Sequence, residues 1–388
     1  MSSDKGIVII GGGACGCSIA YHLAKQGISS QVIERDAIAS QASGKAWAVI
    51  SAPARLLLFF EGREVPQGSM EPCIGLFQKG FHQFPQLAME LKEEGGVDTG
   101  YGELPCIYAV FEEMEETYLK KRMFELAEEG LEASWIEARD IKARIPDINP
   151  RVRGGILYPG YKVEPYKYVL SLFQAAETIG TVMKQGEVVG FRHQGTKVTA
   201  VILTTGEIEA DVVVIAMGPW SGQGTSWLGK EIPQVVKRSQ CLKVEVPQRL
   251  PPYRLLGNQA AIIPQVDGTV VLGDGSASDV IQQRLEDFNI GPTEEAKIKI
   301  VTAASELLPK LEEAKLVEHR AGLYACQPNG GLPMLGRFFE WDNVYIATWF
   351  AAWGIQWSSV VGRVMAHLIV KGYTEEPIEA LSPAKLIG

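Results

Sequence analysis

The sequence predicts an α/β fold in which a Rossmann-like, dinucleotide-binding domain carries a second, inserted domain. Short apolar runs, typical of strands buried on both faces, lie at the start, middle and end of the chain, at residues 7–10, 211–216 and 344–347. The glycine-rich stretch 11–16 follows the first run and leads into a helical pattern. More polar blocks separate the three runs. We therefore expect one domain assembled from three segments, with the second domain inserted twice.

The elements of the first segment follow from local patterns. Residues 7–10 are predicted to form a strand, and residues 14–26 have the periodicity of a helix that ends at Gly27. A second strand is predicted at 31–34. Residues 37–70 show no regular period and hold scattered Ser, Gly and Pro, which predicts mostly loop.

The central part of the chain alternates between helical and extended patterns. Residues 75–130 are mixed and include an acidic helix at 111–131. After an extended stretch at 153–158, Glu164-Pro165 begins a helix with one apolar side. Strands separated by glycine-containing turns are then predicted at 187–193, 197–204, 207–210 and 211–216.

The last part of the chain returns to strands and ends in a helix. Strands are predicted within 238–275, on either side of a proline-rich break at 247–252, and an acidic helix is predicted at 293–315. The final strand, 344–347, leads through an aromatic turn into a helix at 354–371.

Composition sets limits on the class of protein. With 388 residues, of which 46% are hydrophobic, the chain can bury a sizeable core. A net charge of −9 argues against nucleic acid as a partner, because phosphate binding needs clustered Lys and Arg. No apolar stretch reaches the roughly 20 residues of a membrane span. The six cysteines lack C-x-x-C spacing, so we expect a soluble, cytoplasmic protein with reduced thiols.

The stretch 11–16 fits the pattern G-x-G-x-x-G in the structural context that this pattern requires. Gly11 permits the tight turn, Gly13 lets a pyrophosphate approach the backbone, and Gly16 lets helix and strand pack closely. The N-terminus of the helix supplies N–H groups for phosphates. Glu34, 23 residues after Gly11, is placed to accept hydrogen bonds from ribose hydroxyls. NAD and FAD share this pattern, so it leaves both open.

The small-residue loop 40–45 suits a backbone wrapped around a second phosphate or a flavin ring. With this loop in place, the chain resembles the D-amino-acid oxidase/sarcosine oxidase/glycine oxidase (DAO) family of FAD-dependent oxidoreductases. The stretches that carry the resemblance span nearly the whole chain and are 11–27, 32–36, 42–46, 154–180, 206–221, 237–240, 262–274 and 329–348.

The resemblance implies a fold and a set of site residues. It implies a glutathione-reductase-like FAD-binding domain from 1–75, 151–235 and 319–388, and a mixed-sheet substrate domain from 76–150 and 236–318. The cofactor-binding positions that it implies are Gly11, Gly13, Ala14, Cys15, Gly16, Glu34, Arg35, Ser43, Gly44, Lys45, Val188, Gly218, Trp220, Gly336, Gly354, Ile355 and Gln356. A helix N-terminus near Gly354 would stabilise negative charge on a reduced flavin.

The sequence also departs from the family. Members that resemble glycine oxidase have Gly-Leu-Arg-Pro, whose Arg clamps the substrate carboxylate, whereas residues 322–325 here are Gly-Leu-Tyr-Ala. Gly322 stands where related enzymes attach the flavin to a Cys, which predicts non-covalent FAD. Trp47 replaces a small residue, and the segment 347–354 replaces the family's Ala-Thr-Gly-His-Gly.

These departures suggest candidates for the substrate pocket, each with a structural alternative. Tyr324 could replace the missing Arg as a hydrogen-bond donor. Arg320 or Lys45 could anchor an anion, although a structural ion pair is an alternative for Arg320. Trp353 either lines the pocket or belongs to the core. The same choice holds for Trp349 and Phe350, while core packing is favoured for Trp357, and structural roles are favoured for His22 and His319. No metal site is expected.

Two functions remain open from the sequence. The first is oxidation of a C–N bond in an amine or amino-acid-like substrate by hydride transfer to flavin, with O2 or another electron acceptor; oxidation of a 2-hydroxy acid is a variant. The second is a flavoprotein with weakened or lost catalysis that acts as a binding or regulatory protein. The complete nucleotide-binding pattern favours the enzyme.

Overall fold

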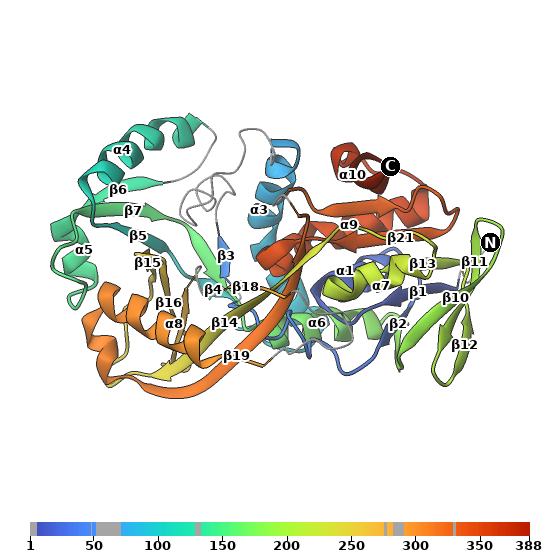
Figure 1. Cartoon of the computed structure of the whole chain (residues 1–388), viewed down its shortest axis with the longest axis horizontal. Coiled ribbons are helices and arrows are strands. Elements are labelled where there is room, and N and C mark those ends of the chain that lie inside the picture. The colour runs from blue at the N-terminus through green and yellow to red at the C-terminus, as the bar shows by residue number, and fades with distance from the viewer. Residues whose placement is uncertain are drawn as a thin grey trace.

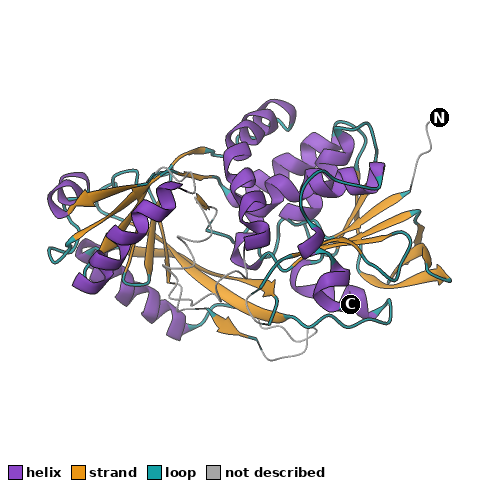
Figure 2. Ribbon diagram, turned by 90° about the horizontal axis from the view of Figure 1, so that it is seen from above, coloured by secondary structure: helices purple, strands orange, loops and turns teal. Residues whose placement is uncertain are grey.

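A computed structural model gives the fold and describes residues 6–47, 49–51, 71–128, 133–274, 278–281, 291–328 and 331–388. Two large sheets dominate it, a six-stranded sheet and a nine-stranded sheet. In Figure 1 the strands of the nine-stranded sheet spread to the left and those of the six-stranded sheet lie to the right. Figure 2 shows a group of helices between these two sets of strands.

The six-stranded sheet brings the three apolar runs together. Its order is β20 (Met334–Arg337), β21 (Val344–Thr348), β13 (Val212–Ile215), β1 (Ile7–Ile10), β2 (Gln31–Glu34) and β9 (Val182–Gln185). All neighbours are parallel except the edge pair β20–β21. Strand β1 is buried along its whole length, as expected for a parallel sheet covered on both faces. The Rossmann-like fold class is therefore confirmed.

Helices cover this sheet and pack closely on one another. Helix α1 (Ala14–Ala24) contacts α9 (Gly354–Lys371) and α6 (Pro165–Glu177), and α9 also contacts α3 (Glu71–Glu94). A side chain at Gly362 of α9 would overlap Ser18 of α1, so the two backbones approach closely there. Helix α6 begins as predicted, because the Glu164 carboxylate accepts a hydrogen bond from the Lys167 N–H at 2.7 Å.

The nine-stranded sheet is mixed, as the resemblance implied. Its order is β18 (Asp279–Val280), β14 (Val235–Glu245), β17 (Val270–Asp274), β16 (Ala260–Pro264), β15 (Arg254–Gly257), β5 (Cys106–Val110), β7 (Gly154–Tyr158) and β6 (Ser134–Glu137), with β19 (Lys315–Cys326) paired to β14. Only β15 and β5 are parallel among these pairs. Helices α4 (Glu113–Glu128), α5 (Ala138–Arg144) and α8 (Glu294–Leu307) accompany it.

The residue boundaries of the two domains stay a prediction. Strand β7 and most of β19 fall within ranges expected for the FAD-binding domain, yet both pair within the nine-stranded sheet. Strand β19 contacts the turn at Gly218–Trp220 as well, so it passes from one sheet toward the other.

Smaller elements complete the fold. Strands β10 (Val188–Gln194), β11 (Lys197–Leu203) and β12 (Gly206–Glu209) form a three-stranded sheet close to the predicted ranges. A second one joins β3 (Val49–Ser51), β8 (Gly160–Lys162) and β4 (Gly102–Glu103), so the 37–70 region contains a strand that the pattern did not predict. Within the range 37–70, residues 48 and 52–70 lie outside the described residues. Helices α7 (Ser221–Ser226) and α10 (Pro383–Ile387) are short.

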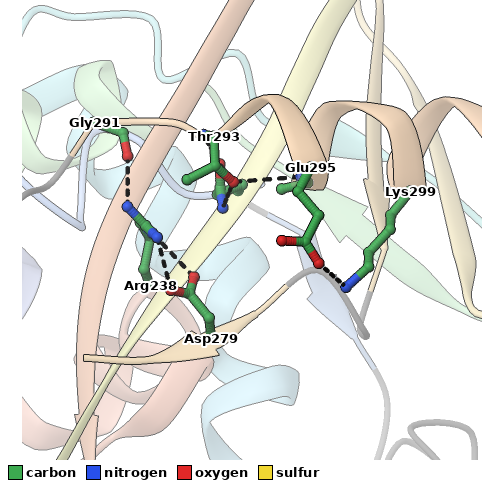
Figure 3. Close-up of polar contacts among 8 residues, drawn as sticks. Arg238, Asp279, Gly291, Thr293, Glu295 and Lys299 are labelled. Carbon is green, nitrogen blue, oxygen red and sulfur yellow. Dashed lines mark hydrogen bonds and ion pairs between the residues drawn. The ribbon is translucent and has the colours of Figure 1, made fainter. Parts of the chain in front are cut away.

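Arg238 joins β14 to its neighbours. Its guanidinium donates to both carboxylate oxygens of Asp279 on β18, at 3.0 and 2.7 Å, and to the Gly291 carbonyl oxygen at 3.0 Å (Figure 3). Thr293 caps α8 and its backbone N–H donates to Gln240 of β14 at 2.7 Å. These contacts hold the segment 291–293, which precedes α8, against β14. The charge of Arg238 is paired with Asp279.

Two properties bear on the compartment. None of the six cysteines forms a disulfide, as expected. Within the described part of the chain, no helix has the length and apolar character needed to cross a bilayer. Cytoplasmic location stays a prediction.

Candidate active site

A long cavity lies at the carboxyl ends of β1, β2 and β13. We call it the nucleotide cavity; it is lined by the turn after β1, the end of β2, the 37–43 loop, Val188, the 216–220 turn and residues from 323–325 and 347–354. The described segments that form it come from the start, middle and end of the chain. Ligands of open parallel sheets bind at this edge.

The turn after β1 has the geometry that phosphate binding requires. Gly11 has φ +111°, and a side chain there would overlap the Ala216 carbonyl. A side chain at Gly16 would overlap the Gly11 carbonyl, so helix and turn can be this close only with glycine. The first turn of α1 contains no acidic residue, and the Ala14 N–H donates to Ser43 Oγ at 3.0 Å. The N-terminus of α1 is thus open to an anion.

The end of β2 carries polar groups suited to a ribose and an adenine. Glu34 Oε2 accepts the Gly12 N–H at 2.7 Å and Oε1 accepts the Asp36 N–H at 3.0 Å, which orients the carboxylate at the cavity. Arg35 lies over the Trp220 ring at 5.2 Å, a cation–π contact at the cavity wall. These features fit the ADP half of a dinucleotide.

A second N-terminus faces the same cavity. Gly354 begins α9, and its carbonyl oxygen lies 4.0 Å from the Cys15 thiol of α1. Burial raises the pKa of Cys15 to about 12, so the thiol stays protonated. The cavity therefore ends between two helix N-termini that favour negative charge.

The comparisons with known proteins agree with this site. Residues 6–368 match the sequence model of the DAO family, described as FAD dependent oxidoreductase. The chain belongs to this family. It is 24% identical over 368 residues to glycine oxidase from Pseudomonas aeruginosa, which covers 94% of each chain.

Solved structures share the fold. The oxidoreductase superposes on glycine oxidase from Geobacillus kaustophilus with a TM-score of 0.87 at 23% identity, over 99% of both chains. It superposes on iminodiacetate oxidase from Chelativorans sp. BNC1 with a TM-score of 0.83 at 22% identity, over 97% of this chain and 98% of that chain. The sequence predictions of an FAD cofactor, of the fold and of an enzyme of the amine and amino-acid oxidase class are confirmed.

The oxidoreductase has a second cavity that continues from the first. We call it the inner cavity, and its lining includes Lys45, Trp47, Ser239, Cys241, Arg254, Gly322, Trp353, Ile355 and Gln356. Ser43, Tyr324 and Gly354 line both cavities, so the two adjoin at these residues. A substrate in the inner cavity would meet a nucleotide-bound flavin near these three residues.

The tryptophan residues of the oxidoreductase divide between cavity and core. Trp47 packs directly on Gly273 of β17, where any side chain would overlap the indole. Trp353 lines the inner cavity and meets Phe77 edge-to-face at 5.9 Å. Trp357 is 2% exposed, lies outside both cavities and packs in the core, as favoured from the sequence.

Trp349 combines both environments. It borders the nucleotide cavity, but its side chain is buried in the cluster that includes Val8, Ile10 and Phe338. Its φ is +65°, a left-handed conformation that is strained for a tryptophan. Phe350, also buried, borders the nucleotide cavity as well.

The structure places most of the predicted site residues at the two cavities. Those at the nucleotide cavity are Gly11, Gly13, Ala14, Cys15, Glu34, Arg35, Ser43, Val188, Gly218, Trp220, Tyr324 and Gly354. Those at the inner cavity alone are Lys45, Trp353, Ile355 and Gln356. Gly16, Gly44 and Gly336 line neither cavity, and the first two are needed for close backbone packing.

Arg320 lies behind the wall of the inner cavity, opposite Cys241 on the neighbouring strand. It lines neither cavity, and its Nε lies 3.7 Å from the Glu318 carboxylate on the same strand. This geometry favours the structural ion pair, and a role of Arg320 as an anion anchor stays a prediction.

The inner cavity is cationic. Its charged lining residues are Lys45 and Arg254, and none of its described lining residues is Asp or Glu. Burial raises the pKa of Cys241 to about 11, so this thiol is neutral. The sequence prediction missed Arg254, which stands outside every motif. The available signal was a charged residue that begins an otherwise apolar strand.

Metal chemistry has no support in the described residues. No group of three or more His, Cys, Asp or Glu side chains in this part of the chain is arranged to hold a metal ion.

Proposed function

We propose that the protein oxidises the C–N bond of amines or amino-acid-like substrates larger than glycine, with FAD held non-covalently. The observation that carries this proposal is the inner cavity, which joins the nucleotide cavity at Tyr324 and Gly354 and has an aromatic wall. The name of its relative from Pseudomonas aeruginosa, glycine oxidase, supports an amine substrate.

The residues of the chain would bind and orient the reactants. Bound FAD would supply the hydride acceptor for oxidation of the C–N bond, and the residues of the chain would hold the substrate carbon toward it. The N-termini of α1 and α9 favour the negative charge of the phosphates and of the reduced ring. Trp47 and Trp353 exclude water and hold an apolar group or a cationic amine. The sequence resemblance predicts that Tyr324 replaces the carboxylate-binding Arg of related enzymes, and Tyr324 lines both cavities.

The absent Gly-Leu-Arg-Pro arginine predicts the substrate range. Charged hydrogen bonds contribute about 1.5–3 kcal/mol each, so a zwitterion that is too small to reach another anchor loses much of its binding without that clamp. We expect glycine, sarcosine and D-alanine to be poor substrates and larger apolar or N-substituted amines to be better ones. Steady-state kinetics across such a panel, with O2 and with an artificial dye as acceptors, tests this expectation. Rapid oxidation of glycine or sarcosine would contradict it.

A second experiment, reoxidation of the reduced flavin, separates an enzyme from a regulatory protein. A flavin that is photoreduced and then mixed with O2 or dye in a stopped-flow instrument reoxidises in an active enzyme. If the flavin reacts neither with any amine nor with any acceptor, the regulatory alternative is the better one. The open inner cavity favours the enzyme.

A further inference from the structure

The wall of the inner cavity holds a buried arginine with no counter-ion in the described part of the chain. Arg254, the first residue of β15, is 5% exposed and lines this cavity. One terminal nitrogen donates to Ser51 Oγ at 3.2 Å, and Nε has no hydrogen-bond partner. Among the described residues, no carboxylate lies within ion-pair distance of it.

Arg238 shows how the same fold pairs an arginine that serves structure. That guanidinium, also largely buried, is bonded to both oxygens of Asp279 and to a carbonyl oxygen (Figure 3). Burying a cation without such partners is strongly unfavourable, because the charge loses its hydration. Arg254 therefore needs an explanation other than packing.

The groups nearest to Arg254 do not supply a negative charge. Burial raises the pKa of Cys106 to about 11 and that of Tyr158 well above its usual value, and the Arg254 charge only opposes these shifts. Both side chains are neutral at pH 7. None of the described residues thus compensates the charge on Arg254.

Gln356 provides a second unused donor at the same place. It is 1% exposed, lines the inner cavity, and its Oε1 accepts the Ser51 N–H at 3.0 Å. Its Nε2 has no hydrogen-bond partner among the residues that the structure describes. Ser51 therefore holds both side chains, through its hydroxyl and its backbone N–H, and leaves a guanidinium and an amide with donors to spare.

We propose that Arg254 and Gln356 bind the carboxylate of the substrate, which makes the substrate an amino acid or an N-substituted amino acid rather than a simple amine. The proposal rests on the proposed function. Two donor groups on one side of a cavity suit the two oxygens of a carboxylate. Arg254 lines the inner cavity alone, whereas Gly354 lines both, so the carboxylate lies at Arg254 and the amine points toward Gly354.

Lys45 is the other cation of this cavity and the main competitor. Its side chain is only partly buried, so it keeps much of its hydration and gains less from a bound anion. We expect Lys45→Met to weaken carboxylate binding less than Arg254→Met does.

Calorimetric titration of the FAD-bound enzyme with phenylacetate and with its neutral analogue phenylacetamide tests the site without turnover. We expect the enzyme to bind phenylacetate about 10- to 100-fold more tightly than phenylacetamide, and Arg254→Met to reduce this ratio to near one. Arg320→Met, which removes a cation outside the cavity, should keep the wild-type ratio. An unchanged ratio in Arg254→Met overturns the proposal.

The thermal midpoint of the unliganded, FAD-bound variant gives an independent reading. Because Arg254→Met removes an uncompensated buried charge, its midpoint should equal or exceed that of the wild type. A large drop means that Arg254 serves structure and also overturns the proposal. If Arg254→Met does not fold, Arg254→Gln decides: it keeps polar donors but removes the charge, and a wild-type ratio overturns the proposal.

The outcomes also separate this proposal from the proposed function. Carboxylate preference in an enzyme that oxidises no amine would keep the Arg254 site and refute amine oxidation. Oxidation of amines with no preference for a carboxylate would support amine oxidation and refute the Arg254 site.

Discussion

Single side chains in this protein are positioned by residues that are distant in the sequence. Ser51, on the short strand β3, holds both Arg254 and Gln356 through separate polar groups. The Glu34 carboxylate is likewise oriented by the Gly12 N–H of the preceding turn. At this scale the chemistry depends on which donors are already bonded and which remain available to a ligand.

Glu34 is predicted to contribute to FAD affinity more than to stability. Removing a carboxylate that accepts ribose hydroxyls should cost about 1.5–3 kcal/mol, which weakens FAD binding by roughly one to two orders of magnitude. Glu34→Gln keeps an oxygen for the Gly12 N–H and should lose less than Glu34→Ala. FAD titration of the apoprotein measures both, with Glu177→Gln, exposed at the end of α6, as control. Wild-type affinity in Glu34→Ala would exclude Glu34 as a ribose ligand.

Trp353 and Trp357, one turn apart, should behave differently. Trp357 is fully enclosed by the core, so Trp357→Ala should lower the free energy of unfolding by about 3–5 kcal/mol. Trp353 lines the inner cavity, so Trp353→Ala should cost less stability and raise KM for aromatic amines more than for small ones. Denaturant unfolding and steady-state kinetics measure the two effects. Unchanged kinetics for every substrate would assign Trp353 to packing alone.

At the scale of elements, helix packing brings distant segments together. Helices α1 and α9 meet along their length, and the Ser18 hydroxyl donates to the Ser358 carbonyl at 2.6 Å. This contact aligns both N-termini with the nucleotide cavity. His22 of α1 packs against Gly362 at the same interface.

Stability at acid pH should depend on His22. Burial, with the charges of Arg363 and Lys25, lowers its pKa to about 3. Between pH 6.5 and about 3 the unfolded chain therefore binds a proton at His22 that the folded chain does not. The free energy of unfolding consequently falls as the pH drops through this window, by up to about 1.4 kcal/mol per unit.

Urea unfolding at pH 7.5 and pH 5.5 tests this dependence. His22→Gln should lose less stability between the two pH values than the wild type does. His82→Gln, which alters an exposed histidine, should behave as the wild type. An equal loss in His22→Gln would show that other groups cause the acid sensitivity.

The elements that local patterns define were predicted, and those that depend on distant pairing were not. Strand β1, the turn after it and α9 are marked by apolar runs and glycines within a few residues. The placement of β7 in the nine-stranded sheet depends on pairing with β5, which no local pattern contains. Arg254 carries only a weak local signal, a charge at the start of an apolar strand. That it faces a cavity with no counter-ion among the described residues is seen only in the folded structure.

The cofactor site joins segments from the start, the middle and the end of the chain. The nucleotide cavity takes residues from 10–43, 186–188, 216–223, 323–325 and 347–354. A ligand that binds only the folded arrangement stabilises it by mass action. FAD should therefore stabilise the protein as a whole.

FAD should be bound non-covalently and should raise the free energy of unfolding of the protein. The sequence resemblance predicts that Gly322 stands where related enzymes attach the flavin. The thiols among the described lining residues of the cavities, Cys15 and Cys241, have pKa values raised by burial, so neither is a thiolate. Acid precipitation should release about one FAD per chain into the supernatant, and a yellow pellet would contradict this. Free FAD at 100 times its Kd should add about 2.7 kcal/mol to the free energy of unfolding, seen as a higher thermal midpoint than that of the apoprotein. Because this stabilisation depends on contacts to the ribose, FAD at the same concentration should raise the thermal midpoint of Glu34→Ala by less than that of the wild type. An equal rise would show that other residues of the cavity supply the binding energy.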